Sequence, residues 1–322
     1  MKKILITGGS GFIGSHLVRQ CLKNGAKVAI TTKYDSIFDN IRLSDIWKKI
    51  TVIESDLRNS DTIHKIDNFN ADTVFHLAAY NDVGGSFSNV QESLTSNLIA
   101  TSNLLENLKK FKQFIYISTS EVYGYQKKAP FVESMIPQPI SPYSIGKYSG
   151  ELYANMHMKF YKRNIKIIRP FNAFGPWQSM KAVIPELIIK SLRGEEIKTT
   201  KGLQTREFNF VENLVDGFIK CADSKKTFNN IYNIGSNKEM RIRDIAFLIH
   251  KLTNSKSKLS IGKLKSRKTD ILRMSANYSK FKNTTNWKPS KTFVDGLKIT
   301  IEWYREYLNN FENSKSSLYK LF

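Results

Sequence analysis

The chain has 322 residues, of which 41% are hydrophobic, and its formal net charge at pH 7 is +22. This length and apolar content predict one large α/β domain, or a nucleotide-binding domain with a smaller appendage. The only cysteines are Cys21 and Cys221, too few for a disulfide framework or a metal cluster, so we predict a reducing compartment and no metal site.

Membranes and nucleic acids are the partners that a strongly basic chain first suggests, and the sequence favours neither. No stretch of about 18 apolar residues is present, and the first residues lack the pattern of a signal peptide, so we expect a cytoplasmic location. The densest lysine cluster, residues 256–268, contains no aromatic residue. We therefore expect an anionic small ligand, no nucleic acid and no membrane.

A strand, a glycine-rich turn and a helix open the chain. An apolar run over residues 4–6 is followed by an amphipathic segment that begins near Phe12 and forms a helix over Ser15–Lys23. The glycines with dinucleotide spacing are Gly8, Gly11 and Gly14. The first helical N–H groups, at Phe12 and Ile13, face an anion there, so the stretch predicts a dinucleotide pyrophosphate site.

The second strand, residues 27–31, leads to the predicted contact with the adenosine ribose. An acidic residue there would bind the 2′-hydroxyl of NAD, but Thr32 and Lys33 occupy the place and the first acid is Asp35. A hydroxyl group and a cation suit a 2′-phosphate better, so the sequence favours NADP over NAD. The alternative is a solvated Lys33 in a permissive site.

The third and fourth strands, residues 51–53 and 73–77, are followed by further cofactor contacts. A carboxylate after the third strand can accept a hydrogen bond from the adenine amino group, and small residues after the fourth strand let the backbone pass close to the cofactor. The residues expected to line this edge are Asp56, Leu57, Leu77, Ala78 and Ala79.

A helix over residues 90–109, which carries Asn97, and a fifth strand over residues 114–118 continue the alternation of strands and helices. This alternation predicts an α/β fold with a Rossmann-like, doubly wound parallel sheet and ligands at the carboxyl ends of the strands.

Hydroxyl groups and a carboxylate gather after the fifth strand, in residues 118–124. Pro142 is well placed to start a helix, which puts Tyr143 and Lys147 four residues apart on one face. The charge of Lys147 is expected to lower the pKa of Tyr143, so that the tyrosine can act as a base.

These segments together resemble the extended short-chain dehydrogenases/reductases of the nucleotide-sugar epimerase and dehydratase family. The matching motifs are TGGSGFIG, DLRN, VFHLAA, STSEVYG, YSIGK and RPFNAFGP. Residues 34–36 and 178–184 further resemble the N-acetylglucosamine nucleotide 4,6-dehydratases of legionaminic-acid-type sugar biosynthesis, which supply surface polysaccharides.

The resemblance implies roles for the central residues. Thr119 binds the 4-hydroxyl group of the sugar, and Tyr143 takes the proton of that hydroxyl while the hydride on carbon 4 passes to the nicotinamide. Lys147 binds the nicotinamide ribose, and Asn97 matches a helix asparagine near the site. The cofactor implied is a tightly bound NADP or NAD.

The resemblance also implies the chemical steps after oxidation. Ser120 and Glu121 match the pair of the 4,6-dehydratases, in which the glutamate removes the hydrogen on carbon 5 and water leaves from carbon 6. Glucose-type dehydratases have Asp in place of Ser120, so either Glu121 acts as both base and acid or a water is relayed through Ser120. The alternatives are a 4-epimerase, a UDP-glucuronate decarboxylase with a similar Thr-Ser-Glu segment, and a non-catalytic NADP-binding regulator.

The alternation breaks at Arg169, where the smaller α+β substrate domain is expected to begin. The predicted division is a dinucleotide domain of residues 1–168 and 208–235 and a nucleotide-sugar domain of residues 169–207 and 236–322. By resemblance the substrate is a UDP- or GDP-linked hexose and the protein is a homodimer. The substrate-binding residues implied are Asn172, Val183, Arg206 and one of Arg267 and Arg273.

Overall fold

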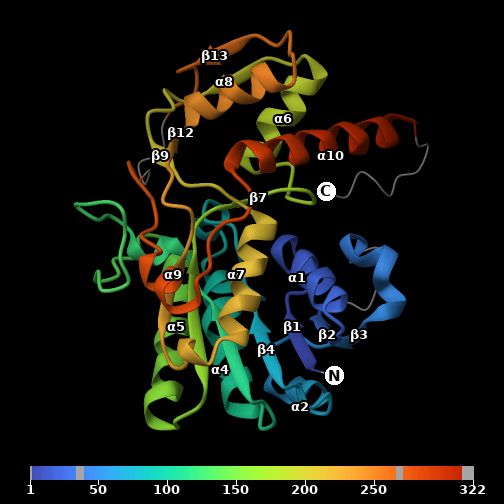
Figure 1. Cartoon of the computed structure of the whole chain (residues 1–322), viewed down its shortest axis with the longest axis vertical. Coiled ribbons are helices and arrows are strands. Elements are labelled where there is room, and N and C mark those ends of the chain that lie inside the picture. The colour runs from blue at the N-terminus through green and yellow to red at the C-terminus, as the bar shows by residue number, and fades with distance from the viewer. Residues whose placement is uncertain (1, 34–39, 266–270, 314–322) are drawn as a thin grey trace.

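A parallel sheet of seven strands forms the centre of the computed structural model, which describes residues 2–33, 40–265 and 271–313 (Figure 1). All neighbouring strands in this sheet run parallel. In spatial order they are β11 (Ile231–Ile234), β6 (Ile165–Pro170), β5 (Gln113–Ile117), β4 (Thr73–His76), β1 (Lys3–Thr7), β2 (Lys27–Thr32) and β3 (Thr51–Glu54). The predicted doubly wound α/β fold is confirmed.

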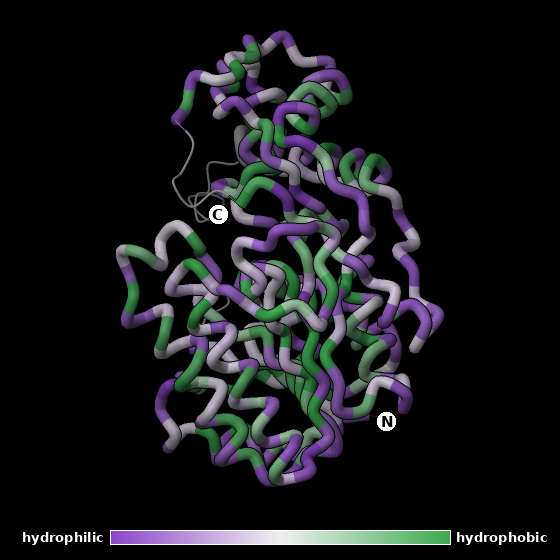
Figure 2. The backbone as a smooth tube through the Cα atoms, turned by 90° about the vertical axis from the view of Figure 1, so that its left-hand side faces the viewer, coloured by the Kyte–Doolittle hydropathy of each residue, from purple (hydrophilic) through white to green (hydrophobic). Residues whose placement is uncertain are grey.

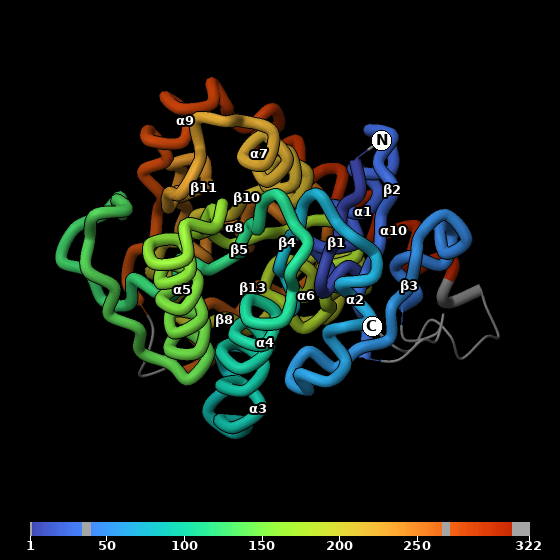
Figure 3. Tube along the Cα trace, turned by 90° about the horizontal axis from the view of Figure 1, so that it is seen from below, coloured from blue at the N-terminus to red at the C-terminus, as the bar shows by residue number. Residues whose placement is uncertain are grey.

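Helices cover both faces of this sheet, as the view from below shows (Figure 3). One face carries α1 (Phe12–Lys23) and α7 (Val211–Asp223), which contact each other. The other face carries α2 (Ile63–Asp67), α4 (Ala100–Asn107) and α5 (Pro142–Phe160). The first helix starts three residues earlier than predicted, because Phe12 already has helical geometry after the glycine turn.

Two buried clusters fill the space between the sheet and its helices. Ile4 and Ile6 of β1 join one cluster with Leu17 of α1, whereas Leu5 joins the other with Leu104 of α4. Successive side chains of a strand point to opposite faces, so a strand covered on both sides must be apolar at every position. Figure 2 shows these apolar strands running through the middle of the lower half.

The helix predicted over residues 90–109 is present but interrupted. Its first part, α3 (Val90–Leu94), is joined to α4 by a π-helical turn, Thr95–Ile99. A π turn is wider than an α turn and often marks a functional position. Here it carries Asn97, whose side chain binds the backbone of Tyr80.

The strand order reverses between β1 and β4, which are neighbours in the sheet although β2 and β3 lie between them in the sequence. Crossovers from the two strands leave toward opposite faces, so a crevice opens at their carboxyl ends. The sheet thereby fixes where a ligand can bind, next to Thr7 and His76.

The segments that form the upper part of the molecule follow β6 (Figure 1). They are β7 (Ala173–Phe174), α6 (Val183–Arg193), β8 (Ile197–Thr199), β9 (Thr205–Arg206), β12 (Met240–Arg241), α8 (Ile242–Leu252), β13 (Leu259–Ile261) and α10 (Phe293–Asn313). β10 (Asn209–Phe210) pairs with β7. α9 (Ser279–Thr285) instead packs on β11, where Lys280 donates to the carbonyl of Ile231. The exact domain division stays a prediction.

Candidate active site

The glycine turn is shaped so that only a very small residue fits at its key positions. Gly8 has a φ of +69°, and a Cβ atom there would lie 2.7 Å from the backbone nitrogen of Ala78. A Cβ atom on Gly14 would lie 2.2 Å from the carbonyl oxygen of Gly8. Gly11 is the N-cap of α1 and provides no side-chain cap. The turn and the uncapped helix start therefore fit a pyrophosphate.

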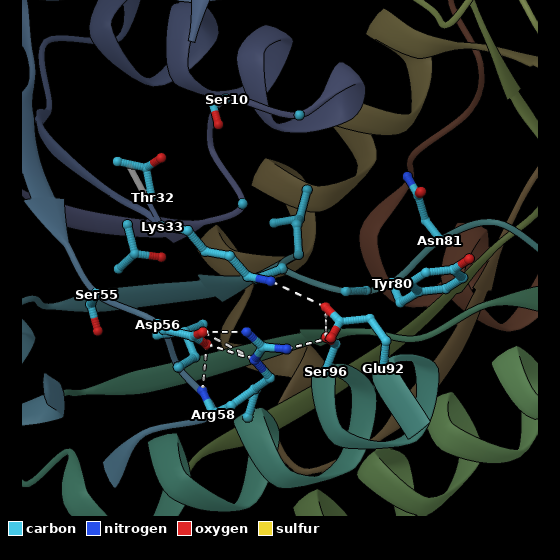
Figure 4. A pocket seen from close by; sticks show the side chains of 18 of the residues that line it. Ser10, Thr32, Lys33, Ser55, Asp56, Arg58, Tyr80, Asn81, Glu92 and Ser96 are labelled. Carbon is cyan, nitrogen blue, oxygen red and sulfur yellow. Dashed lines mark hydrogen bonds and ion pairs between the residues drawn. The ribbon is translucent and has the colours of Figure 1, made fainter. Parts of the chain in front are cut away.

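A cavity of about 630 Å³ lies beside this turn, at the carboxyl ends of the strands (Figure 4). Many residues predicted to bind the cofactor line it: Gly8, Gly11, Thr32, Lys33, Asp56, Leu57, Leu77, Ala78 and Ala79. Phe12, Ile13, Asn97, Tyr143 and Lys147 are not among its lining residues. Arg58, Glu92 and Ser96 line the same cavity but were not predicted from the sequence as cofactor-binding residues. Its size, and a mostly apolar lining that also carries charged and hydroxyl side chains, suit a dinucleotide.

Four charged side chains face one another in this cavity (Figure 4). Lys33 Nζ lies 3.2 Å from Glu92 Oε1, and Arg58 binds both Glu92 and Asp56. The hydrogen bonds from Arg58 hold the pKa of Asp56 below its ordinary value, so this carboxylate is ionised. The predicted bond from adenine to Asp56 would have to share oxygens that already accept from Arg58.

Asn97 acts on the loop that borders the cavity. Its Oδ1 atom accepts a hydrogen bond of 2.9 Å from the Tyr80 backbone nitrogen, and its Nδ2 atom donates to the Tyr80 carbonyl at 3.1 Å. Both ends of the amide are thus used to hold the backbone of one residue. The direct cofactor contact expected for Asn97 stays a prediction.

Thr119 and Tyr143 come together at the end of β5. Thr119 caps a short helical turn, Ser120–Tyr123, and its hydroxyl accepts from the backbone nitrogen of Glu121 at 3.2 Å. Pro142 starts α5 as predicted, behind a capping box of Ser141 and Ser144. Burial raises the pKa of Tyr143 to about 12, although a hydrogen bond with Thr119 lowers it in part.

Lys147 is buried beneath Tyr116 and binds the backbone of β5. Its Nζ atom donates to the carbonyl of Ile117 at 2.6 Å and lies 4.5 Å above the ring of Tyr116. Burial lowers the pKa of Lys147 to about 7, against the opposing charge of Glu151. The pKa of Tyr143 is set here by burial, the charge of Glu121 and the hydrogen bond with Thr119, so the effect of Lys147 on Tyr143 stays a prediction.

Glu121 and Ser120 lie in different surroundings. Burial raises the pKa of Glu121, and the charge of Arg206 opposes that shift. The hydroxyl of Ser120 is buried and donates to Met274 Sδ at 3.3 Å. Glu121 is therefore easier to protonate than an exposed glutamate, whereas the proton of Ser120 is directed at a sulfur atom.

A second cavity of about 540 Å³ separates the upper part from the sheet. Its lining includes the predicted Asn172, Val183 and Arg206, and the basic residues Lys181, Lys190, Lys198 and Lys265. Asn81 and Asp82 line both cavities, so the two spaces meet at this loop. The basic lining fits an anionic ligand.

The predicted arginines have different places. Arg206 NH1 donates to the carbonyls of Thr205, at 2.9 Å, and Ile271. Arg273 is exposed and forms an ion pair with Glu239, away from the second cavity. Arg267 lies outside the described residues. Among the described residues, no group of three His, Cys, Asp or Glu side chains could hold a metal ion, and no helix is long and apolar enough to cross a membrane.

Comparison with known proteins gives one consistent result. The sequence model of the family described as GDP-mannose 4,6 dehydratase matches residues 5–300. A dTDP-D-glucose 4,6-dehydratase of Bos taurus is 31% identical, over 98% of this chain and 92% of the relative. A UDP-N-acetyl-alpha-D-glucosaminuronate decarboxylase of Bacillus cytotoxicus is also 31% identical, over 96% of this chain and 99% of the relative. The structure of a UDP-glucuronic acid 4-epimerase of Bacillus cereus in complex with UDP-glucuronic acid and NAD matches with a TM-score of 0.86 and 29% identity. The match covers 94% of this chain and 99% of the epimerase chain.

Proposed function

Because the chain belongs to the GDP-mannose 4,6-dehydratase family of the extended short-chain dehydrogenases/reductases, we propose that it is an NAD(P)-dependent nucleotide-sugar 4,6-dehydratase. The observation that carries this proposal is the half-buried Glu121, which stands two residues after Thr119 and whose pKa is raised by desolvation. An epimerase needs no acid or base at that position, whereas a dehydratase needs a group that both takes and gives a proton.

The first half of the reaction uses Tyr143 and Thr119. NAD(P), when bound, supplies the acceptor for the hydride of carbon 4 and later returns it to carbon 6. Thr119 orients the 4-hydroxyl group, and Tyr143 removes its proton. Lys147 holds the cofactor ribose. Its ammonium group donates one hydrogen bond to the carbonyl of Ile117 and has further N–H groups that can donate to the ribose.

The second half uses Glu121. A 4-keto group acidifies the hydrogen on carbon 5, which Glu121 removes as a base. The raised pKa then lets the protonated Glu121 donate to the hydroxyl that leaves carbon 6 as water. When the hydride returns to carbon 6, carbon 5 takes a proton from solvent, and Tyr143 releases to solvent the proton that it removed from the 4-hydroxyl group. The bond from Ser120 to Met274 supports this single-residue scheme, because the Ser120 proton is already engaged.

The substrate we propose is a UDP- or GDP-linked hexose, with N-acetylglucosamine as the sugar. The second cavity supports a diphosphate through its lysines and Arg206, whose guanidinium suits two phosphate groups. Asn172 and Val183 line the same space. A cytoplasmic homodimer completes the proposal.

Decarboxylation and epimerisation remain the competing reactions, since relatives and neighbours of similar identity carry those names. Both also begin with oxidation at carbon 4, so Thr119 and Tyr143 do not distinguish them. The presence of Thr119, Tyr143 and Lys147 together speaks against a non-catalytic regulator.

The deciding experiment is incubation of the purified protein with UDP- and GDP-linked N-acetylglucosamine, followed by mass spectrometry. A product lighter by one water is expected, and Glu121→Gln should abolish it while ultraviolet absorbance still reports oxidation at carbon 4. Glu302→Gln on the exposed side of α10 is the matched control. A new isomer of unchanged mass would contradict dehydration, and loss of carbon dioxide from UDP-glucuronate would indicate a decarboxylase.

A further inference from the structure

We propose that Glu92 is a specificity-determining residue that makes the first cavity select NAD over NADP. The inference rests on the proposed function only in requiring that a nicotinamide dinucleotide binds beside the glycine turn. It concerns one end of the cavity, where the carboxyl ends of β2 and β3 lie (Figure 4). It reverses the cofactor preference that the sequence suggests.

The position of Lys33 explains why the sequence favours NADP. Lys33 directly follows β2, and in this fold the end of that strand faces the 2′ position of the adenosine ribose. Arg58 follows β3 and adds a second cation to the same cavity. Two cations at this place would form a phosphate clamp if nothing neutralised them.

Glu92 forms ion pairs with both cations. Glu92 lies in α3, 59 residues after Lys33 in the sequence, and its Oε1 atom lies 3.2 Å from Lys33 Nζ. Its other oxygen pairs with Arg58 NH1. Ser96 Oγ donates to Glu92 Oε1 at 3.2 Å and fixes the carboxylate in this orientation.

Among the described residues in this part of the cavity, the charges therefore cancel. Lys33 and Arg58 contribute two positive charges, and Asp56 and Glu92 contribute two negative ones. Burial acts to raise the pKa of Glu92, but Lys33, Arg58 and Ser96 together outweigh it, so the pKa is lowered and the carboxylate is ionised. A 2′-phosphate dianion would meet two carboxylates and would have to break the ion pairs of Glu92.

The 2′-hydroxyl of NAD has no such conflict. A hydroxyl group is neutral and can donate to a carboxylate or to the hydroxyl of Thr32, which lines the same cavity. The ion pairs of Lys33 and Arg58 remain intact when it binds. Discrimination between the two cofactors thus depends on the negative charge of Glu92.

The test measures binding and needs no turnover. Wild-type protein is freed of bound nucleotide and titrated with NAD and with NADP in a calorimeter, and so are Glu92→Gln and the control Glu302→Gln, which makes the same change of charge on α10. We expect the wild type and the control to bind NAD more tightly than they bind NADP. Glu92→Gln should bind NADP about tenfold more tightly than the wild type, with affinity for NAD changed less than about twofold, the scale of one unit charge near a phosphate in a partly solvated site.

Two further measurements sharpen the result. The gain in NADP affinity should shrink as salt is added, because exposed charges are screened. It should also disappear in Glu92→Gln combined with Lys33→Met, because no lysine then remains to bind the phosphate. A wild type that prefers NADP, or an NADP-to-NAD ratio that Glu92→Gln leaves unchanged, would overturn the proposal. These outcomes are independent of whether the reaction is dehydration, epimerisation or decarboxylation.

Discussion

At the scale of single residues, the site depends on hydroxyl groups that are held in place by their own backbone. Thr119 accepts from the backbone nitrogen of Glu121, which fixes the direction of its hydroxyl toward Tyr143. Burial keeps the pKa of Tyr143 high, and the hydrogen bond from Thr119 is the contact that lowers it. One short turn therefore sets both the position and the acidity of the proposed base.

Replacing Thr119 by alanine is expected to lower kcat roughly a hundredfold, the loss typical of one oriented hydrogen-bond donor in an active site. The pKa of Tyr143 rises when this bond is lost, so the alkaline rise of kcat/KM with pH should move to higher pH. Steady-state kinetics across a pH series measure both effects. Thr119→Ser keeps the hydroxyl and should restore the profile, and a profile that does not move in Thr119→Ala would contradict this role.

At the scale of elements, two glycines let α5 approach the π-helical turn closely. A Cβ atom on Gly150 would lie 2.5 Å from the hydroxyl of Tyr116 and 2.7 Å from the carbonyl of Asn97, and one on Gly146 would lie 3.0 Å from the Asn97 Cβ. The close packing of these helices brings Lys147 over Tyr116. The geometry of the site thus depends on the absence of side chains at Gly146 and Gly150.

Gly150→Ala should push α5 away from the π-helical turn and lower the free energy of unfolding by about 1–3 kcal/mol, as overpacked cores do. Chemical denaturation of the variant beside Lys159→Ala, an exposed position on the same helix, measures the loss. Activity should fall as well, because Tyr143 and Lys147 move with the helix. Unchanged stability would mean that the helices already have room for a methyl group.

Features with a local signature could be predicted from the sequence. The spacing of Gly8 and Gly11 predicted the turn, and Pro142 predicted the start of α5. Contacts between segments far apart in the sequence could not be predicted, because no residue pattern within one segment indicates which distant segment it will contact. Lys33 meets Glu92 across 59 residues, and Ser120 meets Met274 across 154. The cofactor preference and the proton path that we propose depend on contacts of this second kind.

At the scale of the whole molecule, one loop joins the sheet part to the upper part. The ring of Trp177 packs 5.0 Å from that of Trp303 in α10, and Tyr304 of the same helix donates to the carbonyl of Gln178. From the sheet side, Arg42 donates to the carbonyl of Trp177 at 2.9 Å. The second cavity lies between the parts that this loop connects.

Trp303→Ala should loosen this junction, with a loss of about 2 kcal/mol in the free energy of unfolding, less than for a fully buried tryptophan. The KM for the nucleotide sugar should rise several-fold while kcat changes little, because the residues of the chemical step remain in place. Glu302→Gln, the neighbouring exposed position on α10, is the control. A fall in kcat with unchanged KM would show that the junction acts on the chemistry instead.

The place of β1 in the sheet has a consequence for how the protein is made. This strand comes first in the sequence but lies in the middle of the sheet, with β2 on one side and β4 on the other. A ribosome has finished β2 by residue 32, whereas β4 ends only at His76. In that interval a nascent chain carries an apolar strand with one unpaired edge, which can pair with the wrong partner. A chaperone that shields residues 3–7 would therefore act early and briefly during translation.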